Sequence, residues 1–357
     1  MRILVEILHP AHVHFFRHAI GHWQARGDEV SVLSREKDVA IQLLDAYGIQ
    51  HTSLSRLGPA KWQLAIEMLV RDARMLRHCL FQRPDVLVGI MGVTIAQVGK
   101  LIGRPAIVFY DTENATLTNR FVYPLAHSVC TPECYQGPVW GRHVTYPGYH
   151  ELAYLHPSRF TPDANVVKRR GIDPDSAYFL LRFVSWQASH DVGETGFDRR
   201  AQRRLIEVLK QHGRVLISSE QPLPPDLEEY RFSAPAHEMH HFLAHAKLLV
   251  GESATMASEA AVLGVPAVYI ADTGRGYTDE QQQRYQLVKN FNNHQHDEAL
   301  LHVQALLADE HTHARAQEQR KQLLSERIDT TAWIVSYVDR VVDEREGGKP
   351  GSGRQDP

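Results

Sequence analysis

Short runs of apolar residues alternate along the first half of the chain with segments whose apolar residues recur every three or four positions. The runs cover residues 3–8, 29–33, 85–91, 106–110 and 128–130. Each has the length and composition of a buried strand. After the first run, Phe16, Ile20 and Trp23 have the spacing of one helix face. Strands that alternate with helices of this length indicate βαβ units and a parallel sheet.

The second half repeats this pattern after a turn-rich segment at residues 145–175. Predicted strands lie at residues 178–183, 215–218, 248–250 and 267–270, and predicted helices near 198–211, 237–245, 255–264 and 279–291. A chain of 357 residues is long enough for two cores. We therefore predict an α/β protein with two Rossmann-like, doubly wound domains, residues 1–150 and 175–328, that face a cleft. Residues 344–357 are polar and rich in Gly and Pro, which predicts a disordered tail.

The corner between the predicted strand at 248–250 and the helix after it has the clearest chemical character. Gly251 permits a tight turn, Ser253 suits the N-cap position, and Gly264 ends the helix. A helix N-terminus at the carboxyl end of a parallel strand offers free N–H groups and the positive end of the helix dipole, so it suits a phosphate. Glu259 lies too far along the helix to cap it, and its carboxylate can accept hydrogen bonds from the vicinal hydroxyls of a sugar.

Residues 251–267, Gly-Glu-Ser-Ala-Thr-Met-Ala-Ser-Glu-Ala-Ala-Val-Leu-Gly-Val-Pro-Ala, resemble the nucleotide-sugar motif in the second domain of GT-B enzymes. Those enzymes include the UDP-GlcNAc 2-epimerases and the N-acetylglucosaminyltransferases that form lipid II. The resemblance implies that Ser253, Ala254 and Thr255 hold a diphosphate and that Glu259 holds a ribose. It also implies that a last helix, residues 329–343, crosses back onto the first domain. An ordinary strand–turn–helix connection is the alternative interpretation of this segment.

Most of residues 1–340 also resemble the family called domain of unknown function 354, or DUF354, which is placed in the GT-B superfamily. The resemblance rests on residues 9–16 (His-Pro-Ala-His-Val-His-Phe-Phe), on residues 181–186 (Leu-Arg-Phe-Val-Ser-Trp) and on the motif at 251–266. The family name carries no reaction, so the mechanism has to be inferred from individual residues.

His12 is a candidate general base because it follows the first strand, where the loop faces the cleft, and because histidine titrates near neutral pH. A histidine occupies the same place in the lipid II-forming enzymes. Metal binding by His9, His12 and His14 is the rival interpretation, but no Asp, Glu or Cys nearby completes a ligand set, so we expect neither a metal nor a cofactor. We expect a solvated stripe from the histidines spaced four apart on this helix, His14, His18 and His22.

Asp111 and Glu113 follow the predicted strand at 106–110 and can supply the acid or base that sugar chemistry needs. Capping of the next helix is the alternative role for both. The epimerases carry a glutamate that falls on Asp111. Two other catalytic elements of the epimerase pattern are absent from this chain, which disfavours epimerisation.

Four further residues are candidates for nucleotide-sugar binding. Arg182 ends a predicted strand at the mouth of the cleft, where its guanidinium can hold a diphosphate, and Trp186 can stack on a base or a sugar. An ion pair and core packing are the respective alternatives. Asp279 and Gln282 begin a helix after a Gly-rich loop and can contact the donor sugar, or can simply cap the helix.

These residues favour a metal-independent glycosyltransferase that uses a nucleotide sugar, UDP-linked by the resemblance, to build a polysaccharide or glycoconjugate. The acceptor is not indicated. A UDP-sugar epimerase, a nucleotide-sugar hydrolase and a non-catalytic nucleotide-sugar-binding protein remain alternatives. Release of UDP, formation of a sugar isomer or inertness would distinguish them.

Composition limits the partners. The net charge is −3, from 39 basic and 42 acidic residues, which argues against nucleic acid. Three cysteines, no signal peptide and no apolar run of membrane-spanning length indicate a cytoplasmic protein. The pattern at residues 62–80 predicts an amphipathic basic helix. Its basic face either contacts the inner membrane surface peripherally or is solvated. The oligomeric state is not indicated.

Overall fold

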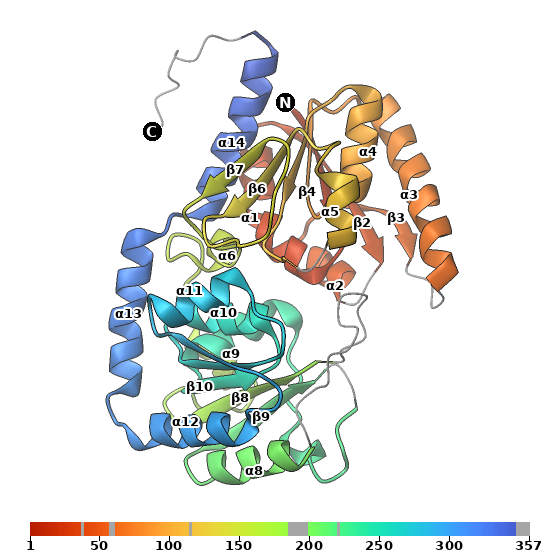
Figure 1. Ribbon diagram of the computed structural model, residues 1–357. Helices are drawn as coiled ribbons and strands as arrows, with labels where there is room; N and C mark the ends of the chain where they lie inside the picture. The colour runs from red at the N-terminus through yellow and green to blue at the C-terminus, as the bar shows by residue number, and fades with distance from the viewer. Residues whose placement is uncertain (37–38, 57–60, 114–115, 185–198, 220–221, 348–357) are drawn as a thin grey trace.

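The computed structural model describes residues 1–347 except 37–38, 57–60, 114–115, 185–198 and 220–221. Two α/β domains lie one above the other, each built on a parallel sheet covered by helices on both faces (Figure 1). The α/β class with two Rossmann-like domains, predicted from the alternating pattern, is therefore confirmed.

The first sheet has seven strands in the order β3-β2-β1-β4-β5-β6-β7, and all neighbours are parallel. Its strands are β1 (Arg2–Ile7), β2 (Glu29–Glu36), β3 (Thr52–Arg56), β4 (Val86–Ile90), β5 (Ala106–Phe109), β6 (Ser128–Pro132) and β7 (His143–Tyr146). Its helices are α1 (Pro10–Ala25), α2 (Ala40–Ala46), α3 (Lys61–Gln82), α4 (Val93–Ile102) and α5 (Thr116–Val122). Two short helices, α6 (Leu152–Leu155) and α7 (Ala164–Arg169), lead into the second domain.

The second sheet has five parallel strands in the order β12-β11-β10-β8-β9. The strands are β8 (Tyr178–Phe183), β9 (Arg214–Ser219), β10 (Leu248–Gly251), β11 (Ala267–Ile270) and β12 (Val288–Phe291). The helices are α8 (Arg199–Leu209), α9 (Met239–His245), α10 (Ala254–Leu263), α11 (Gly276–Gln283) and α12 (His296–Ala308), followed by α13 (Thr312–Glu326) and α14 (Thr330–Arg345).

Three differences from the predicted elements have clear physical causes. The helix predicted over 279–291 is wrong in its second half, because α11 ends at Gln283 and the chain continues as strand β12. Strands β3 and β7 were not predicted. They lie at the two edges of the first sheet, where strands are short and carry polar residues, so their apolar pattern is weak. Strand β12, an edge strand of the second sheet, was not predicted for the same reason.

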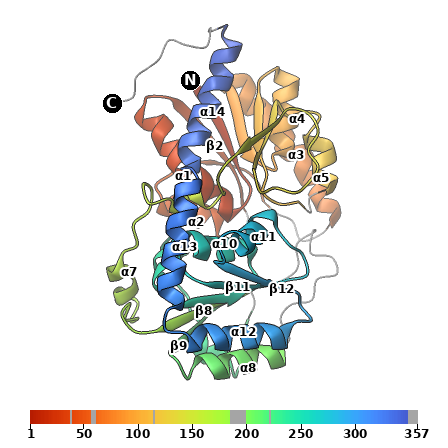
Figure 2. The same ribbon diagram turned by 60° about the vertical axis from the view of Figure 1, so that its left-hand side comes forward.

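Helices α13 and α14 run along one side of the molecule, α13 beside the second domain and α14 beside the first (Figures 1 and 2). Helix α14 packs on α1 and α6, and Arg26 beside the end of α1 donates to Asp339 at 2.7 Å. Trp333 places its ring 4.7 Å from that of Tyr146. Thr330 donates its hydroxyl proton to the carbonyl of Tyr149 at 2.7 Å. Helix α14 therefore packs against the first domain and is hydrogen-bonded to the segment that connects the two domains.

Each sheet reverses its strand order at one place, and ligands of doubly wound folds bind there. In the first sheet the reversal lies between β1 and β4, beside the first turn of α1, which carries His12. In the second it lies between β8 and β10, beside the corner at Gly251. The fold thus brings both predicted candidate regions to the carboxyl edges of the two sheets.

Candidate functional site

The corner between β10 and α10 has the geometry of an anion site. A Cβ atom added to Gly251 would clash with the carbonyl oxygen of Arg182 on β8, so only glycine allows these two strands to approach here. Ser253 is the N-cap of α10, and its hydroxyl accepts from the N–H of Met256 at 3.3 Å. Ser253, Ala254 and Thr255 are all partly exposed. The first-turn N–H groups of an α-helix have no acceptor within the helix, so this turn can hold a diphosphate.

Glu259 sits one turn deeper on α10, at the contact between the two domains. Its side chain is buried, and its Oε1 atom accepts from the Tyr154 hydroxyl at 2.9 Å and lies 2.9 Å from Nε2 of His240. Tyr154 belongs to the connecting segment and His240 to α9. The predicted ribose contact therefore needs either the second carboxylate oxygen of Glu259 or a rearrangement of these two partners.

Glu151 is a site residue that the sequence reasoning missed. It caps α6 in the connecting segment, is buried, and accepts from the hydroxyl of Ser258 on α10 at 2.8 Å. Gln281 on α11 donates to the same hydroxyl at 2.7 Å. Burial, together with the negative charge of Asp111, raises the pKa of Glu151 to about 8. Glu151 therefore remains mostly protonated at neutral pH and joins the connecting segment to α10.

Asp111 follows β5, and its pKa is shifted in the opposite direction from that of Glu151. Its Oδ2 atom lies 3.0 Å from Nδ1 of His150, and its Oδ1 atom accepts from the Thr112 hydroxyl at 3.0 Å. Burial opposes ionisation of Asp111, but the charge and hydrogen bond of His150 outweigh it and lower the pKa to about 2. Asp111 and Glu151 are thus two carboxyl groups whose pKa values are driven apart, an arrangement typical of acid–base sites.

His150 was also missed, because it stands in a turn-rich segment with no motif around it. Its ring is buried, with its centroid 4.4 Å from that of Phe15 on α1. Nδ1 faces Asp111, and Nε2 is buried with no hydrogen-bond partner among the residues that the structure describes. An aspartate that fixes one ring nitrogen leaves the other to accept a proton, as in hydrolase triads.

The other predicted acid–base residues have different surroundings. Glu113 accepts from the backbone N–H of Gly276, at the start of α11, at 3.1 Å, and burial raises its pKa. It therefore links the two domains. His12 is buried, and its Nδ1 accepts from the N–H of Leu8 at 3.2 Å.

His14 does not belong to a solvated stripe, so that expectation is wrong. Its ring lies 4.7 Å from His240 and 5.2 Å from Tyr154, in the contact between α1 and the second domain. Burial, followed by the positive charge of neighbouring groups, lowers its pKa well below the usual value. His14 was misjudged because the packing partner on α9 lies more than two hundred residues away in sequence.

The remaining predicted residues for nucleotide-sugar binding differ in whether they lie beside the corner between β10 and α10. Nη1 of Arg182 donates to the Ser218 hydroxyl at 2.9 Å, beside Gly251 at the end of β8. Trp186 lies outside the described residues. Asp279 and Gln282 turn towards β12, where Asn290 donates to Asp279 at 3.0 Å and to Gln282 at 2.7 Å. Their predicted contact with the donor sugar has no support from this geometry.

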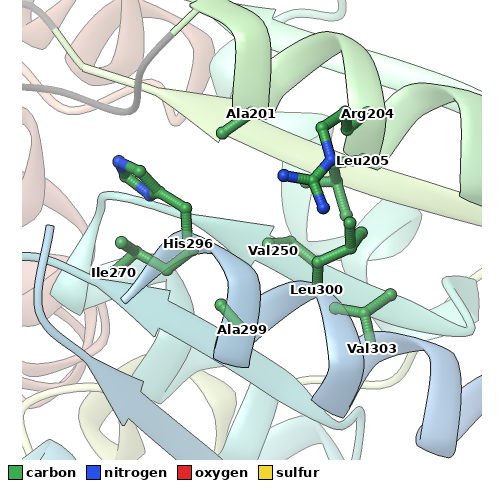
Figure 3. A pocket seen from close by; sticks show the side chains of 9 residues that line it. All are labelled: Ala201, Arg204, Leu205, Val250, Ile270, His296, Ala299, Leu300 and Val303. Atoms are coloured by element: carbon green, nitrogen blue, oxygen red, sulfur yellow. The ribbon is translucent and has the colours of Figure 1, made fainter. Parts of the chain in front are cut away.

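The second domain has a small hollow on the other side of its sheet, between α8 and α12 (Figure 3). Its walls are apolar except for Arg204 and His296, and it has room for about one water molecule. It is too small for a nucleotide. Among the described residues, no three His, Cys, Asp or Glu side chains are grouped as a metal site, and no helix is long and apolar enough to span a membrane.

Comparisons with known proteins agree with this fold. The sequence model of a family described as "Protein of unknown function (DUF354)" matches residues 1–275. A curated relative in Halorhodospira halophila, UDP-N-acetylglucosamine–N-acetylmuramyl-(pentapeptide) pyrophosphoryl-undecaprenol N-acetylglucosamine transferase, is 34% identical over 91 residues, which are 25% of this chain and 24% of that protein. The match thus spans about a quarter of the length of each.

Two solved structures show the same architecture. The UDP-GlcNAc 2-epimerase from Methanocaldococcus jannaschii has a TM-score of 0.61 and 12% identity, over 87% of this chain and 94% of that one. The spinosyn rhamnosyltransferase SpnG, solved with thymidine diphosphate, has a TM-score of 0.62 and 15% identity, over 95% and 100%. The fold is therefore GT-B-like, shared by glycosyltransferases and epimerases.

Proposed function

The chain belongs to the DUF354 family, and we propose that it is a glycosyltransferase that transfers a sugar from a nucleoside diphosphate to an acceptor hydroxyl. The observation that carries the proposal is the partly exposed first turn of α10 at the strand-order reversal of the second sheet. It lies on the same helix as Ser258, which bonds to Glu151 beside the acid–base residues of the first domain. UDP is the first nucleotide to test, because the transferase in H. halophila and the epimerase in M. jannaschii are named for UDP-sugars.

The first turn of α10 holds the diphosphate in this proposal. Its N–H groups and the positive end of the helix dipole stabilise the charge that develops on the leaving nucleotide. Arg182, at the end of the adjacent strand, adds a cation on the same side. A site built in this way needs no metal to neutralise the diphosphate.

His150, held by Asp111, accepts the proton of the acceptor hydroxyl in this proposal. Asp111 stays ionised because its pKa is about 2, so it fixes the ring of His150 and stabilises the imidazolium that forms. Nε2 of His150 is enclosed in this conformation, so the acceptor has to enter between the domains to reach it. His12 is the alternative base, since it lies in the first turn of α1 beside the strand-order reversal of the first sheet.

An epimerase is the second candidate, because the fold is shared with the UDP-GlcNAc 2-epimerase of M. jannaschii. Epimerisation needs no acceptor. Incubation with UDP-GlcNAc alone therefore separates the two reactions: an epimerase forms a sugar isomer, whereas a transferase releases UDP only when an acceptor fraction is added.

Variants at the acid–base residues test the mechanism. Asp111→Asn and His150→Gln should each lower turnover by about 10²–10⁴-fold, the usual contribution of a positioned acid or base. Binding of UDP, followed by calorimetry, should change little because neither residue touches the first turn of α10. If His12→Gln abolishes turnover while His150→Gln keeps it, the assignment of His150 is wrong. Absence of any sugar transfer or UDP release with all tested nucleotide sugars would contradict the proposed function itself.

A further inference from the structure

Helix α3 exposes a row of large apolar side chains on its outward face. Leu69 is 66% exposed, Leu80 is 62% exposed and Phe81 is 76% exposed. Ile66 and Val70 extend the row with 52% and 38% exposure. Five of the ten exposed large hydrophobic residues in the described part of the chain thus lie on this single helix. A concentration of this kind marks an interaction surface.

The row has the spacing of one helix face. It runs from residue 66 through 69 and 70 to 80 and 81, with Ala73 and Arg77 exposed in between. Over 15 residues an α-helix rises about 22 Å, so the face is long and narrow. Met75 and Cys79 point the other way and are buried in the core beneath α3. The core beneath α3 is therefore formed by the opposite face of the helix, and the outward apolar residues leave much of their surface exposed.

The same face is positively charged. Arg77 is exposed on it, and its guanidinium lies 6.0 Å from the centre of the Phe81 ring. Arg83 is exposed just beyond the end of α3, and the exposed Arg74 donates to the carbonyl of Leu54 on β3. The carboxylate of Glu67 is already engaged by Arg35 at 2.7 Å. Residues 61–83 include five basic residues and two acidic ones, whereas the whole chain carries a net charge of −3. The helix is therefore a basic, apolar element on an otherwise acidic protein.

We propose that the outward face of α3 binds the surface of an anionic lipid bilayer. Exposed leucine and phenylalanine side chains can enter the boundary between headgroups and acyl chains, while arginine side chains reach up to the lipid phosphates. The sign of the charge selects an anionic leaflet, which attracts each basic residue near its surface. This inference concerns a surface distant from α10 and does not depend on the proposed function.

Sedimentation of the full chain with vesicles tests this surface. The protein should bind vesicles that contain phosphatidylglycerol, bind pure phosphatidylcholine vesicles at least tenfold more weakly, and dissociate as salt is raised. The double variant Leu69→Gln, Phe81→Gln should lose at least tenfold in binding. Leu301→Gln on α12 is the matched control, because Leu301 is 65% exposed on the other domain, and it should bind as the wild type does.

Three outcomes would overturn the inference. The first is a wild-type protein that does not bind phosphatidylglycerol vesicles. The second is binding that the change at Leu69 and Phe81 leaves intact. The third is a dimer, detected by light scattering, that the same double variant dissociates, because the face would then pair with a second copy of the chain. Circular dichroism verifies that each variant is folded, so a failure here is distinct from a failure of the proposed function.

Discussion

At the scale of single residues, the site depends on how burial and charge separate two carboxyl groups. Asp111 keeps a low pKa because His150 donates to it, whereas burial and the negative charge of Asp111 raise the pKa of Glu151. Either residue read alone in the sequence is an ordinary carboxylate. Their different pKa values arise from the contact of Asp111 with His150 and from the charge of Asp111 near Glu151, which only the fold provides.

Substitution of Glu151 tests the difference between the pKa values of Asp111 and Glu151 through the pH dependence of the free energy of unfolding. The pKa of Glu151 is raised from 4.5 to about 8, so the folded state binds the proton more tightly than the unfolded state. The contribution of this proton to the free energy of unfolding is fully present below pH 4.5. It is lost as pH rises towards 8, by up to roughly 1.4 kcal/mol per pH unit. Glu151→Gln keeps an acceptor for Ser258 and should remove this decline between those pH values.

Chemical denaturation at a series of pH values measures the effect. The exposed Glu298→Gln on α12 is the control, and its stability should follow the wild-type curve. A Glu151→Gln protein that loses stability with pH as steeply as the wild type would show that Glu151 does not carry the proton.

At the scale of elements, the corner between β10 and α10 depends on backbone contact between strands. β10 lies beside β8 in register, with Gly251 opposite Arg182. The N–H of Glu252 then donates to the carbonyl of Arg182 at 3.0 Å, and the Glu252 carboxylate accepts from the N–H of Val184 at 2.8 Å. These contacts hold the start of α10 at the edge of the sheet.

Gly251→Ala should destabilise the protein by about 1–3 kcal/mol, because the added methyl group meets the backbone of Arg182, which cannot move aside. Gly21→Ala in α1 is the control: nothing lies within 4 Å of the added atom, so it should be neutral or stabilising. Urea denaturation compares the two. Equal stability of both variants would show that the close approach of β8 and β10 is not needed.

The same elements show which parts of the fold and of the candidate site could be predicted from the sequence. Apolar runs such as Leu248–Val250 and the glycine and serine after them predicted the corner, because strand, turn and cap signals are local. Edge strand β12 was not predicted, since it has only four residues and only the first and the last of them are buried. His150 and His14 were not placed correctly, because their partners, Asp111 and His240, are distant in sequence. Local signals located the corner between β10 and α10, whereas the pairing of Asp111 with His150 needed tertiary contacts.

At the scale of the whole molecule, the two domains share one continuous core. Buried residues from β1 and α1 of the first domain belong to the same cluster as those of α10 and β10 in the second. Tyr154, Glu151 and Glu113 add hydrogen bonds across this contact. The corner between β10 and α10 and the carboxyl groups of Asp111 and Glu151 are therefore held in one assembly, as the proposed transfer between two bound substrates requires.

Isothermal titration calorimetry with UDP tests the central claim, that the first turn of α10 binds a nucleoside diphosphate. Ala254→Asp places a carboxylate in that turn, whereas Ala314→Asp places one in the first turn of α13, away from the corner. The account predicts that the wild type and Ala314→Asp bind UDP alike and that Ala254→Asp binds at least tenfold more weakly, a loss of about 1.4 kcal/mol. Equal binding by all three proteins would contradict it.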